Sequence, residues 1–125
     1  MRDWIRDDCT KKSGVEEEFK VAWNSTLYRI GGKIFVMICE YKDGRPLLTA
    51  KLEPMFSEIL RAQYPGDIIP GYYTDKNHWS SLFLESNVPD DTVRAMLNNA
   101  YETTFRSLTK KAQARILDQS PDISE

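Results

Sequence analysis

The sequence predicts an α+β domain of two layers, in which helices pack against an antiparallel sheet. Three observations carry this prediction: a two-glycine turn between β-type segments, a third β-type segment after a short second turn, and helical segments that do not alternate strictly with the strands. The 125 residues are 41% hydrophobic and 29% charged, the length and balance of one globular domain. We expect this domain to span residues 1–117 and a disordered acidic tail to follow over residues 118–125.

The N-terminal segment, residues 2–12, predicts a short helix. Trp4, Ile5 and Cys9 share one helical face by their spacing, and charged residues occupy the other face. The acidic run at residues 16–18 follows, and we expect it to be a solvent-exposed face or a loop.

The next segment predicts a β-hairpin. Two β-type stretches, residues 26–30 and 33–41, flank the glycines at 31–32, which can supply the two positive φ angles of a type I′ turn. A regular two-residue turn places Tyr28 opposite Phe35. The second stretch is apolar on both faces, so we expect it to be a central strand.

A third strand and a helix complete the first half of the chain. A turn at residues 42–46 leads into a strand at 47–52, so the three strands form an antiparallel meander. Pro54 is suited to the first position of a helix that runs to about residue 63. Its apolar positions, which we expect to be buried, are Met55, Phe56, Ile59 and Leu60.

The second half predicts a bend, a strand and a long helix. Prolines and glycines make residues 67–71 an irregular bend, and residues 78–85 are typical of a strand. A helix is expected from about residue 89 to 108, with acidic residues at its N-terminus. A break at residues 109–111 precedes a last helical turn.

Charge and cysteine content restrict the function. The net charge of −2 argues against a surface uniformly adapted to nucleic acid, so any such surface must be a local patch. Cys9 and Cys39 have no metal-ligand spacing and are expected to be buried free thiols in a reducing compartment. The first residues lack a hydrophobic leader and no apolar run is long enough to span a bilayer, so we expect a cytoplasmic protein without membrane contact.

Enzyme motifs find little support in this sequence. A chain with one histidine, His78, cannot form a site with paired histidines, and no Cys/His cluster is present. The glycine pair lies in a hairpin rather than in a phosphate-binding loop, and no nucleophile-elbow pattern occurs. We therefore predict no catalytic residue, no cofactor and no metal ligand.

The segment 70–79 contains the densest group of chemically versatile side chains. Tyr72, Tyr73, Lys76 and His78 could line a cleft or contact a partner. If the segment is extended, the two tyrosines face opposite ways and one of them is exposed. A structural role in the bend remains the alternative for the lysine and the histidine.

Two neighbours of that group have simpler interpretations. Asp75 could pair with His78 if the chain is locally helical. Trp79 begins a strand, and we expect it to fill part of the core.

A nucleic-acid hypothesis rests on four cations beside the two turns. Arg29 and Lys33 flank the first turn, and Lys42 and Arg45 flank the second. These turns lie at opposite ends of their shared strand, and about four phosphate contacts would give only modest, salt-sensitive affinity. The alternative is that these charges keep the hairpin ends soluble. A second basic region, which could also serve to cap a helix C-terminus, contains Arg106, Lys110, Lys111 and Arg115.

The order of several short motifs resembles the MmcQ/YjbR family over nearly the whole chain. These motifs are Gly31-Gly32-Lys33-Ile34-Phe35, Leu52-Glu53-Pro54, Tyr64-Pro65-Gly66, Pro70-Gly71-Tyr72, Lys76-Asn77-His78-Trp79, Tyr101-Glu102 and Lys110-Lys111. The resemblance implies a two-layer α+β fold related in shape to type III secretion chaperones. It also implies the family's label of a double-wing DNA-binding protein, and it brings no catalytic residues. Glu53 and Thr109 depart from the family's usual aspartate and proline.

The leading hypothesis is thus a non-enzymatic, cytoplasmic, bacterial protein that binds double-stranded DNA through basic hairpin wings. The alternative is a protein-interaction module with an unidentified protein partner, which meets it at an open sheet face or edge. A weaker alternative is a small-ligand binder or enzyme with a cleft at Tyr72, Lys76 and His78.

Overall fold

The structure, a computed structural model, describes residues 2–72 and 74–118. Its helices are α1 (Trp4–Thr10), the short 3-10 helix η1 (Val21–Trp23), α2 (Pro54–Gln63), α3 (Asp90–Ser107) and α4 (Lys110–Asp118). Its strands are β1 (Val15–Lys20), β2 (Ser25–Ile30), β3 (Lys33–Glu40), β4 (Pro46–Lys51), β5 (Ile68–Pro70) and β6 (Trp79–Phe83). The predicted α+β fold is confirmed. Most of the predicted acidic tail lies outside the described residues.

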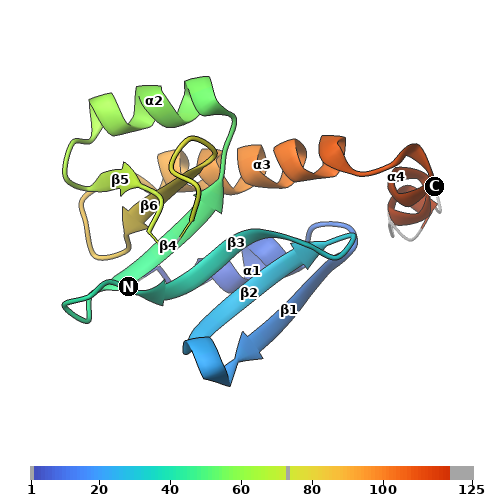
Figure 1. Ribbon diagram of the computed structural model, residues 1–125, viewed down its shortest axis with the longest axis horizontal. Helices are drawn as coiled ribbons and strands as arrows, with labels where there is room; N and C mark the ends of the chain where they lie inside the picture. The colour runs from blue at the N-terminus through green and yellow to red at the C-terminus, as the bar shows by residue number, and fades with distance from the viewer. Residues whose placement is uncertain (1, 73, 119–125) are drawn as a thin grey trace.

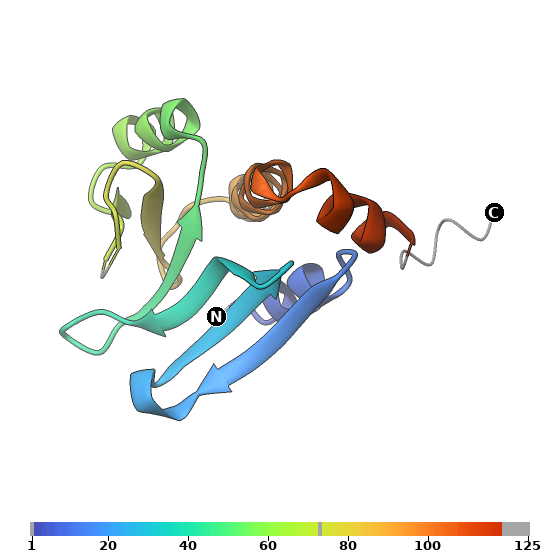
Figure 2. The same cartoon turned by 45° about the vertical axis from the view of Figure 1, so that its right-hand side comes forward.

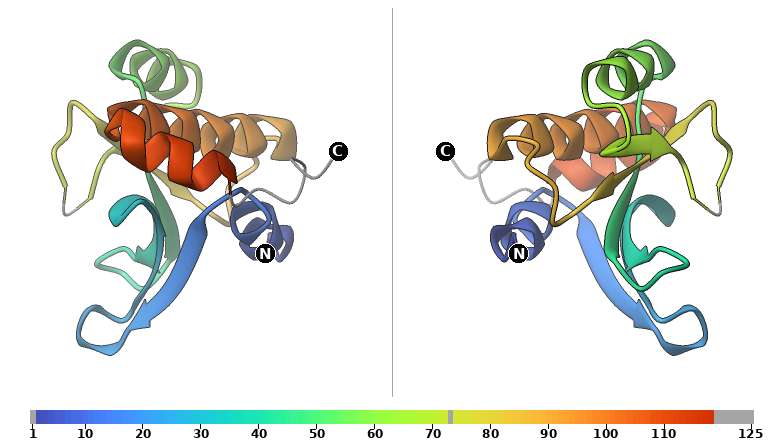
Figure 3. Two further views of the ribbon diagram at one scale, coloured as in Figure 1. Left: turned by 90° about the vertical axis from the view of Figure 1, so that its right-hand side faces the viewer. Right: turned by 90° about the vertical axis from the view of Figure 1, so that its left-hand side faces the viewer.

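The strands form one antiparallel sheet in the order β1-β2-β3-β4-β6-β5 (Figure 1). The sheet bends between β3 and β4, so that β1, β2 and β3 project as a separate half, which we call the lobe (Figure 2). Helix α3 packs across β3, β4 and β2, helix α1 packs on β1, and helix α2 packs on β5 and β6. The helices therefore cover the middle and one end of the sheet, and the lobe extends beyond them (Figure 3).

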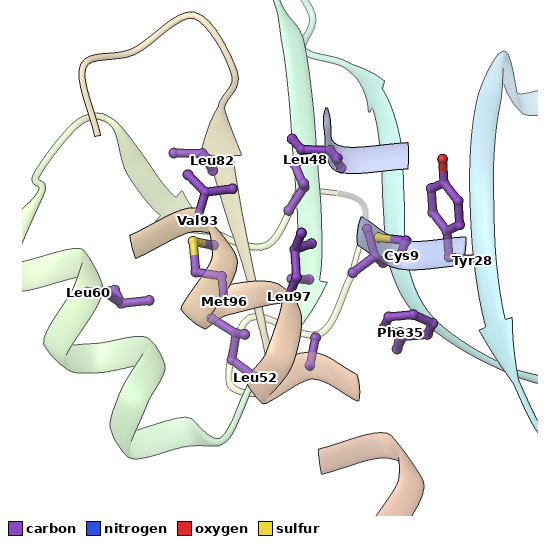
Figure 4. Packing of buried hydrophobic residues seen from close by; sticks show 14 of the residues in the cluster. Cys9, Tyr28, Phe35, Leu48, Leu52, Leu60, Leu82, Val93, Met96 and Leu97 are labelled. Carbon is purple, nitrogen blue, oxygen red and sulfur yellow. The ribbon is translucent and has the colours of Figure 1, made fainter. Parts of the chain in front are cut away.

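The main core lies between α3 and the sheet (Figure 4). The inward face of α3 supplies Val93, Met96, Leu97 and Ala100, all fully buried, as its apolar spacing predicts. They pack against Leu48, Ala50 and Leu82 of β4 and β6 and against Phe35 and Val36 of β3. This cluster holds the lobe and the rest of the sheet in one domain.

A smaller cluster lies on the opposite face of the sheet. Cys39, Leu47 and Phe83 form its buried part, and Tyr41 and Tyr72 pack on them with ring centroids 4.8 Å apart. Since neighbouring residues of a strand point to opposite faces, β3 and β4 contribute to both clusters. This agrees with the prediction that the second strand is covered on both sides.

Both cysteines are free and buried, as predicted. Burial raises the pKa of the Cys9 thiol to about 12, and burial also raises the pKa of Cys39. Both groups therefore stay protonated and unreactive at neutral pH.

The hairpin turn is confirmed, but its register differs from the prediction. Gly31 and Gly32 have φ angles of 58° and 83°, as a type I′ turn requires. Tyr28 nevertheless pairs with Val36, because a bulge shifts the register between Tyr28 and Arg29. The bulge inserts an extra residue, so that two adjacent residues of β3, at 35–36, are both fully buried.

Three further predictions of local structure need correction. Met55 and Ile59 of α2 are 70% and 57% exposed, because the helix turns Ser57 and Leu60 towards the sheet instead. The acidic run at residues 16–18 is exposed as predicted, but it forms part of a regular strand, β1. The bend at 67–71 contains the short strand β5, which pairs with β6.

The turn of the β2–β3 hairpin gives a stability prediction. A Cβ on Gly31 would lie 2.8 Å from Cδ1 of Leu108, whereas a Cβ on Gly32 would meet nothing within 4 Å. Both substitutions to alanine strain the backbone, but only Gly31→Ala also forces a side chain of the core to move. We expect Gly31→Ala to lower the free energy of unfolding by about 2–4 kcal/mol and Gly32→Ala by about 1–2 kcal/mol. Urea denaturation measures both, and equal losses would contradict the packing of Leu108 over this turn.

Candidate protein-interaction site

The four cations of the DNA-binding prediction are already engaged within the protein. Arg29 pairs with Glu18 across β1 and β2, and Arg45 pairs with Asp43 at 2.8 Å. The guanidinium of Arg45 also lies over the Phe83 ring, 4.0 Å from its centroid. Two of the four charges are thus neutralised, and the two turns lie at opposite ends of β3, as predicted.

The two remaining cations have different surroundings. The Nζ atom of Lys42 lies 5.7 Å from the centroid of the Tyr41 ring. Lys33 extends from the hairpin to α3, where its Nζ lies 3.4 Å from both the carbonyl oxygen and the Oγ of Ser107. The structure therefore brings Lys33 beside the basic region of the C-terminal helices. In the sequence, Lys33 and that region stand as two separate groups of cations.

We call this second region the cationic corner; it comprises Lys33, Arg106, Lys110, Lys111 and Arg115. Arg106 pairs with Glu102 at 3.0 Å, but no ion pair involves the other four within residues 2–72 and 74–118. Arg115, the hairpin glycines and the acidic Glu16 of β1 line one hollow of about 210 Å³ between α4 and the turn. The corner is thus a local cationic surface on a protein of net charge −2.

The predicted cleft residues are dispersed rather than convergent. His78 is hydrogen-bonded through Nδ1 to Asp75 at 2.6 Å, which confirms that pairing. Lys76 donates to the Gly71 carbonyl at 3.0 Å, so it holds the bend together. Tyr72 packs on the smaller cluster of Cys39, Leu47 and Phe83. The hydrogen bond from His78 lowers the pKa of the Asp75 carboxyl.

Two residues of this segment need separate mention. Tyr73 lies outside the described residues, so the prediction for the tyrosine pair is not tested. Trp79 is half-buried and belongs to neither core cluster, so the prediction that it fills the core is wrong. It starts β6 opposite Lys51, near the end of the sheet.

The lobe carries a groove that the sequence did not reveal. The groove has a volume of about 450 Å³ and lies between α1 and strands β1, β2 and β3, on the face of the sheet that carries the main core. Its apolar lining consists of Ile5, Phe19, Tyr28, Ile38 and Leu84. Such a lining suits an apolar side chain of a ligand or partner.

Exposed apolar residues also occur at the end of β1 and in η1, which follows it. Phe19, Val21 and Trp23 are 57%, 81% and 53% exposed, and Phe19 also lines the groove. We call these three residues the tip patch. The Nζ atom of Lys20 lies 4.2 Å from the centroid of the Trp23 ring and partly shields it. Neighbouring exposed apolar side chains of this size mark interaction surfaces more often than isolated ones do.

Polar contacts hold the rim of the groove in place. The hydroxyl of Tyr28 donates to Oε2 of Glu17 at 2.8 Å, and Nε of Arg6 lies 3.2 Å from the same oxygen. Burial and the hydrogen bond to Glu17 raise the pKa of Tyr28 well above its usual value, so its hydroxyl remains a donor. The rim therefore presents a fixed carboxylate between an arginine and a tyrosine.

Arg2 anchors the other wall. Its side chain, which is 10% exposed, donates to the carbonyl oxygens of Leu84 at 3.1 Å and Ser86 at 2.8 Å and pairs with Asp90. These contacts fasten the start of α1 to the connection between β6 and α3. The groove is thus bounded by elements that are fixed relative to one another.

Strand β1 forms one edge of the sheet and borders the groove. It pairs with β2 only, and no other described element lies beyond it in Figures 1 and 2. Glu16, Glu17 and Glu18 are exposed along it. The sequence did contain a signal for this site, since three large apolar residues at 19, 21 and 23 follow the acidic run directly. Their spacing does not place them on one face, because β1 ends at Lys20 and residues 21–23 form η1.

The fold places this chain among small α+β proteins in which helices pack on one part of an antiparallel sheet and leave the lobe projecting. Residues 10–103 match the sequence model of the YjbR family. The chain therefore belongs to the YjbR family, as its motifs predicted.

Relatives of known sequence agree with this assignment. The uncharacterized protein YjbR of Escherichia coli strain K12 is 27% identical over 103 residues, which cover 82% of this chain and 86% of that protein. The uncharacterized protein YbdF of Escherichia coli O157:H7 is 31% identical over 90 residues, which cover 72% of each chain.

Solved structures share the fold. The crystal structure of Deinococcus radiodurans protein DR2400, which contains a DUF419 domain, superposes with a TM-score of 0.80 at 24% identity and covers 91% of this chain and 86% of its own. A crystal structure of a Pseudomonas syringae protein gives a TM-score of 0.69 at 15% identity and covers 83% and 98%. Within the described part of this chain, no helix is both long and apolar enough to span a bilayer.

Proposed function

We propose that this protein is a non-enzymatic binding module that holds a segment of a partner protein in the lobe groove. The observation that carries the proposal is the apolar groove, whose lining includes Phe19 of the tip patch, with Val21 and Trp23 exposed a few residues further along the chain. Since the core of an interface depends on buried apolar anchors, this surface suits a protein partner better than a phosphate backbone. We place this function in the cytoplasm, in keeping with two free thiols.

An estimate of the binding energy supports a role for the groove. Full burial of the three side chains contributes on the order of 5–6 kcal/mol, because about half of Phe19 and Trp23 and about a fifth of Val21 are already covered in the free protein. A micromolar complex requires about 8 kcal/mol. The tip patch alone therefore gives weak binding, and an anchor in the groove is needed to reach micromolar affinity.

Selection of peptides from a random library tests this proposal. We expect the wild-type protein to enrich peptides that bind it. The double variant Phe19→Ser with Trp23→Ser should bind the same peptides at least tenfold more weakly. Met55→Ser with Ile59→Ser is the matched control, because it removes two exposed apolar side chains from α2, away from the lobe. Enriched peptides that bind both variants equally well would overturn the proposal, and so would repeated selections that enrich none.

The cationic corner supports DNA as a second candidate ligand. Lys33, Lys110, Lys111 and Arg115 lack ion-pair partners among the described residues, unlike Arg29 and Arg45 of the predicted double-wing surface. With about four phosphates neutralised, the logarithm of the affinity should fall with the logarithm of salt with a slope of about −4. We therefore propose the corner, rather than both hairpin turns, as the DNA contact.

Anisotropy of a labelled DNA duplex across a range of salt concentrations measures this. Lys110→Ala with Lys111→Ala should reduce the slope by about 2, whereas Lys42→Ala with Arg45→Ala at the opposite end of β3 should leave it unchanged. Absence of measurable duplex binding at low salt would exclude DNA as a ligand.

A further inference from the structure

We propose that the partner segment binds as an extended strand along the free edge of β1, with basic residues on one of its faces and apolar residues on the other. This inference rests on the proposed function and specifies the chemistry of the partner. It begins with the strand pairing: β1 pairs with β2 over six residues, from Val15↔Ile30 to Lys20↔Ser25, without a register shift. A regular strand of this length presents an unpaired row of backbone groups on its outer side.

The side chains of β1 divide between two faces. Glu17 and Phe19 point to the groove, where both line the hollow, and Glu17 accepts the Tyr28 hydroxyl at 2.8 Å. Glu16 and Glu18 alternate with them, so they lie on the opposite face. Glu18 pairs with Arg29 there, and Glu16 has no ion pair among the described residues. The groove face of the edge therefore carries Phe19 beside the Glu17 carboxylate, and the other face carries Glu16 and Glu18 beside Arg29 of β2.

An added strand would follow the same alternation. Its residues on the groove side would lie beside Phe19 and could place one apolar side chain between α1 and the sheet. Its residues on the other side would lie beside Glu16 and Glu18, where lysine or arginine gains a cross-strand pair and an acidic residue is repelled. The fitting segment thus alternates basic and apolar residues over about six positions.

The same charges disfavour a second copy of this chain as the occupant. Antiparallel pairing of β1 with its own copy, in the registers that overlap at least five of its six residues, places glutamates of the run 16–18 opposite glutamates. Like charges directly opposite each other destabilise a strand pair. The glutamates of the edge therefore disfavour self-association in these registers and favour a basic strand.

Synthetic peptides of alternating lysine and valine test the inference. They are N-methylated at every second residue, so that only one edge can pair and the peptide stays monomeric. We expect the lysine–valine peptide to bind, a glutamate–valine peptide to bind at least tenfold more weakly, and backbone amides of β1 to gain protection from hydrogen exchange. Glu16→Lys should weaken binding of the lysine–valine peptide at least threefold, and Glu58→Lys on α2, an exposed acid outside the lobe, should leave it unchanged.

The outcomes separate this inference from the function on which it rests. One outcome would overturn the strand pairing and leave the groove function intact. In it, Phe19→Ser with Trp23→Ser abolishes binding of the lysine–valine peptide, but the glutamate–valine peptide binds the wild-type protein equally well and the amides of β1 gain no protection. Failure of the lysine–valine peptide to bind would also overturn the inference, while peptides selected from the random library would still support the groove. Sedimentation could show that the wild-type protein is a dimer and that the Glu16→Pro variant is a monomer. This result would identify a second copy as the occupant of the edge and overturn the proposal of a basic partner strand.

Discussion

Substitution of Phe35 by alanine is expected to remove a large part of the stability of this protein. The side chain is fully buried, and its ring meets that of Tyr101 edge to face at 5.7 Å. Loss of a buried phenylalanine costs about 3–5 kcal/mol through lost transfer energy and a residual cavity. A domain of this size has roughly 5–15 kcal/mol in all. The melting temperature should therefore fall by roughly 10–20 °C.

The neighbouring position provides the control. Ile34 is half-buried and lies on the other side of the bulge, where it pairs with Arg29. We expect Ile34→Ala to lower the free energy of unfolding by about 1–2 kcal/mol, because a half-buried side chain removes less apolar area from water on folding than the fully buried Phe35 does. Thermal unfolding followed by circular dichroism compares the two variants. Equal losses would mean that the bulge does not turn Phe35 into the core.

The second large effect concerns Arg2. Replacement by alanine removes one ion pair and two hydrogen bonds that join the start of α1 to the connection between β6 and α3, which is more than 80 residues away in sequence. Two carbonyl oxygens and a carboxylate lose a charged donor in a nearly buried position. We expect a loss of about 2–4 kcal/mol in the free energy of unfolding.

A matched arginine distinguishes this anchor from an ordinary surface charge. Arg106 pairs with Glu102, and both side chains are more than 60% exposed. Arg106→Ala should therefore change stability by no more than about 1 kcal/mol. Guanidinium chloride denaturation measures both variants, and a loss of the same small size for Arg2→Ala would contradict its role in fixing the wall of the groove.

Local chemistry predicted much of this fold because several signals act over a few residues. The glycines at 31–32 define a hairpin turn without tertiary information, and Pro54 marks the start of α2. The apolar spacing of α3 predicted its buried face because the whole helix lies on the sheet. In each case, backbone geometry or a long periodic pattern decides the structure.

The failures arise where tertiary contacts decide. The bulge in β3 exists because Phe35 and Val36 both find space in the core, which no two-residue turn rule can reveal. Helix α2 has apolar residues on more than one side, and the hydroxyl of Ser57 is buried against that of Ser80. Met55 and Ile59 consequently face solvent.

The candidate site was missed for a related reason. The acidic run at residues 16–18 lacks the β-branched and aromatic residues that indicate a strand, so β1 was absent from the predicted meander. Without β1 there is no groove, no free edge and no partner for Arg29. The charge of Arg29 then looks available for DNA, although the structure pairs it with Glu18.

The most direct test of the groove is a chemical-shift map of the protein with a peptide selected from the random library. The account predicts that amide signals of Phe19, Thr26 and Ile38 and the indole signal of Trp23 move on binding. Signals of Leu47 and Phe83 on the opposite face should stay in place. A map with its largest shifts on α2, on the cationic corner or around His78, with the lobe unchanged, would contradict the account.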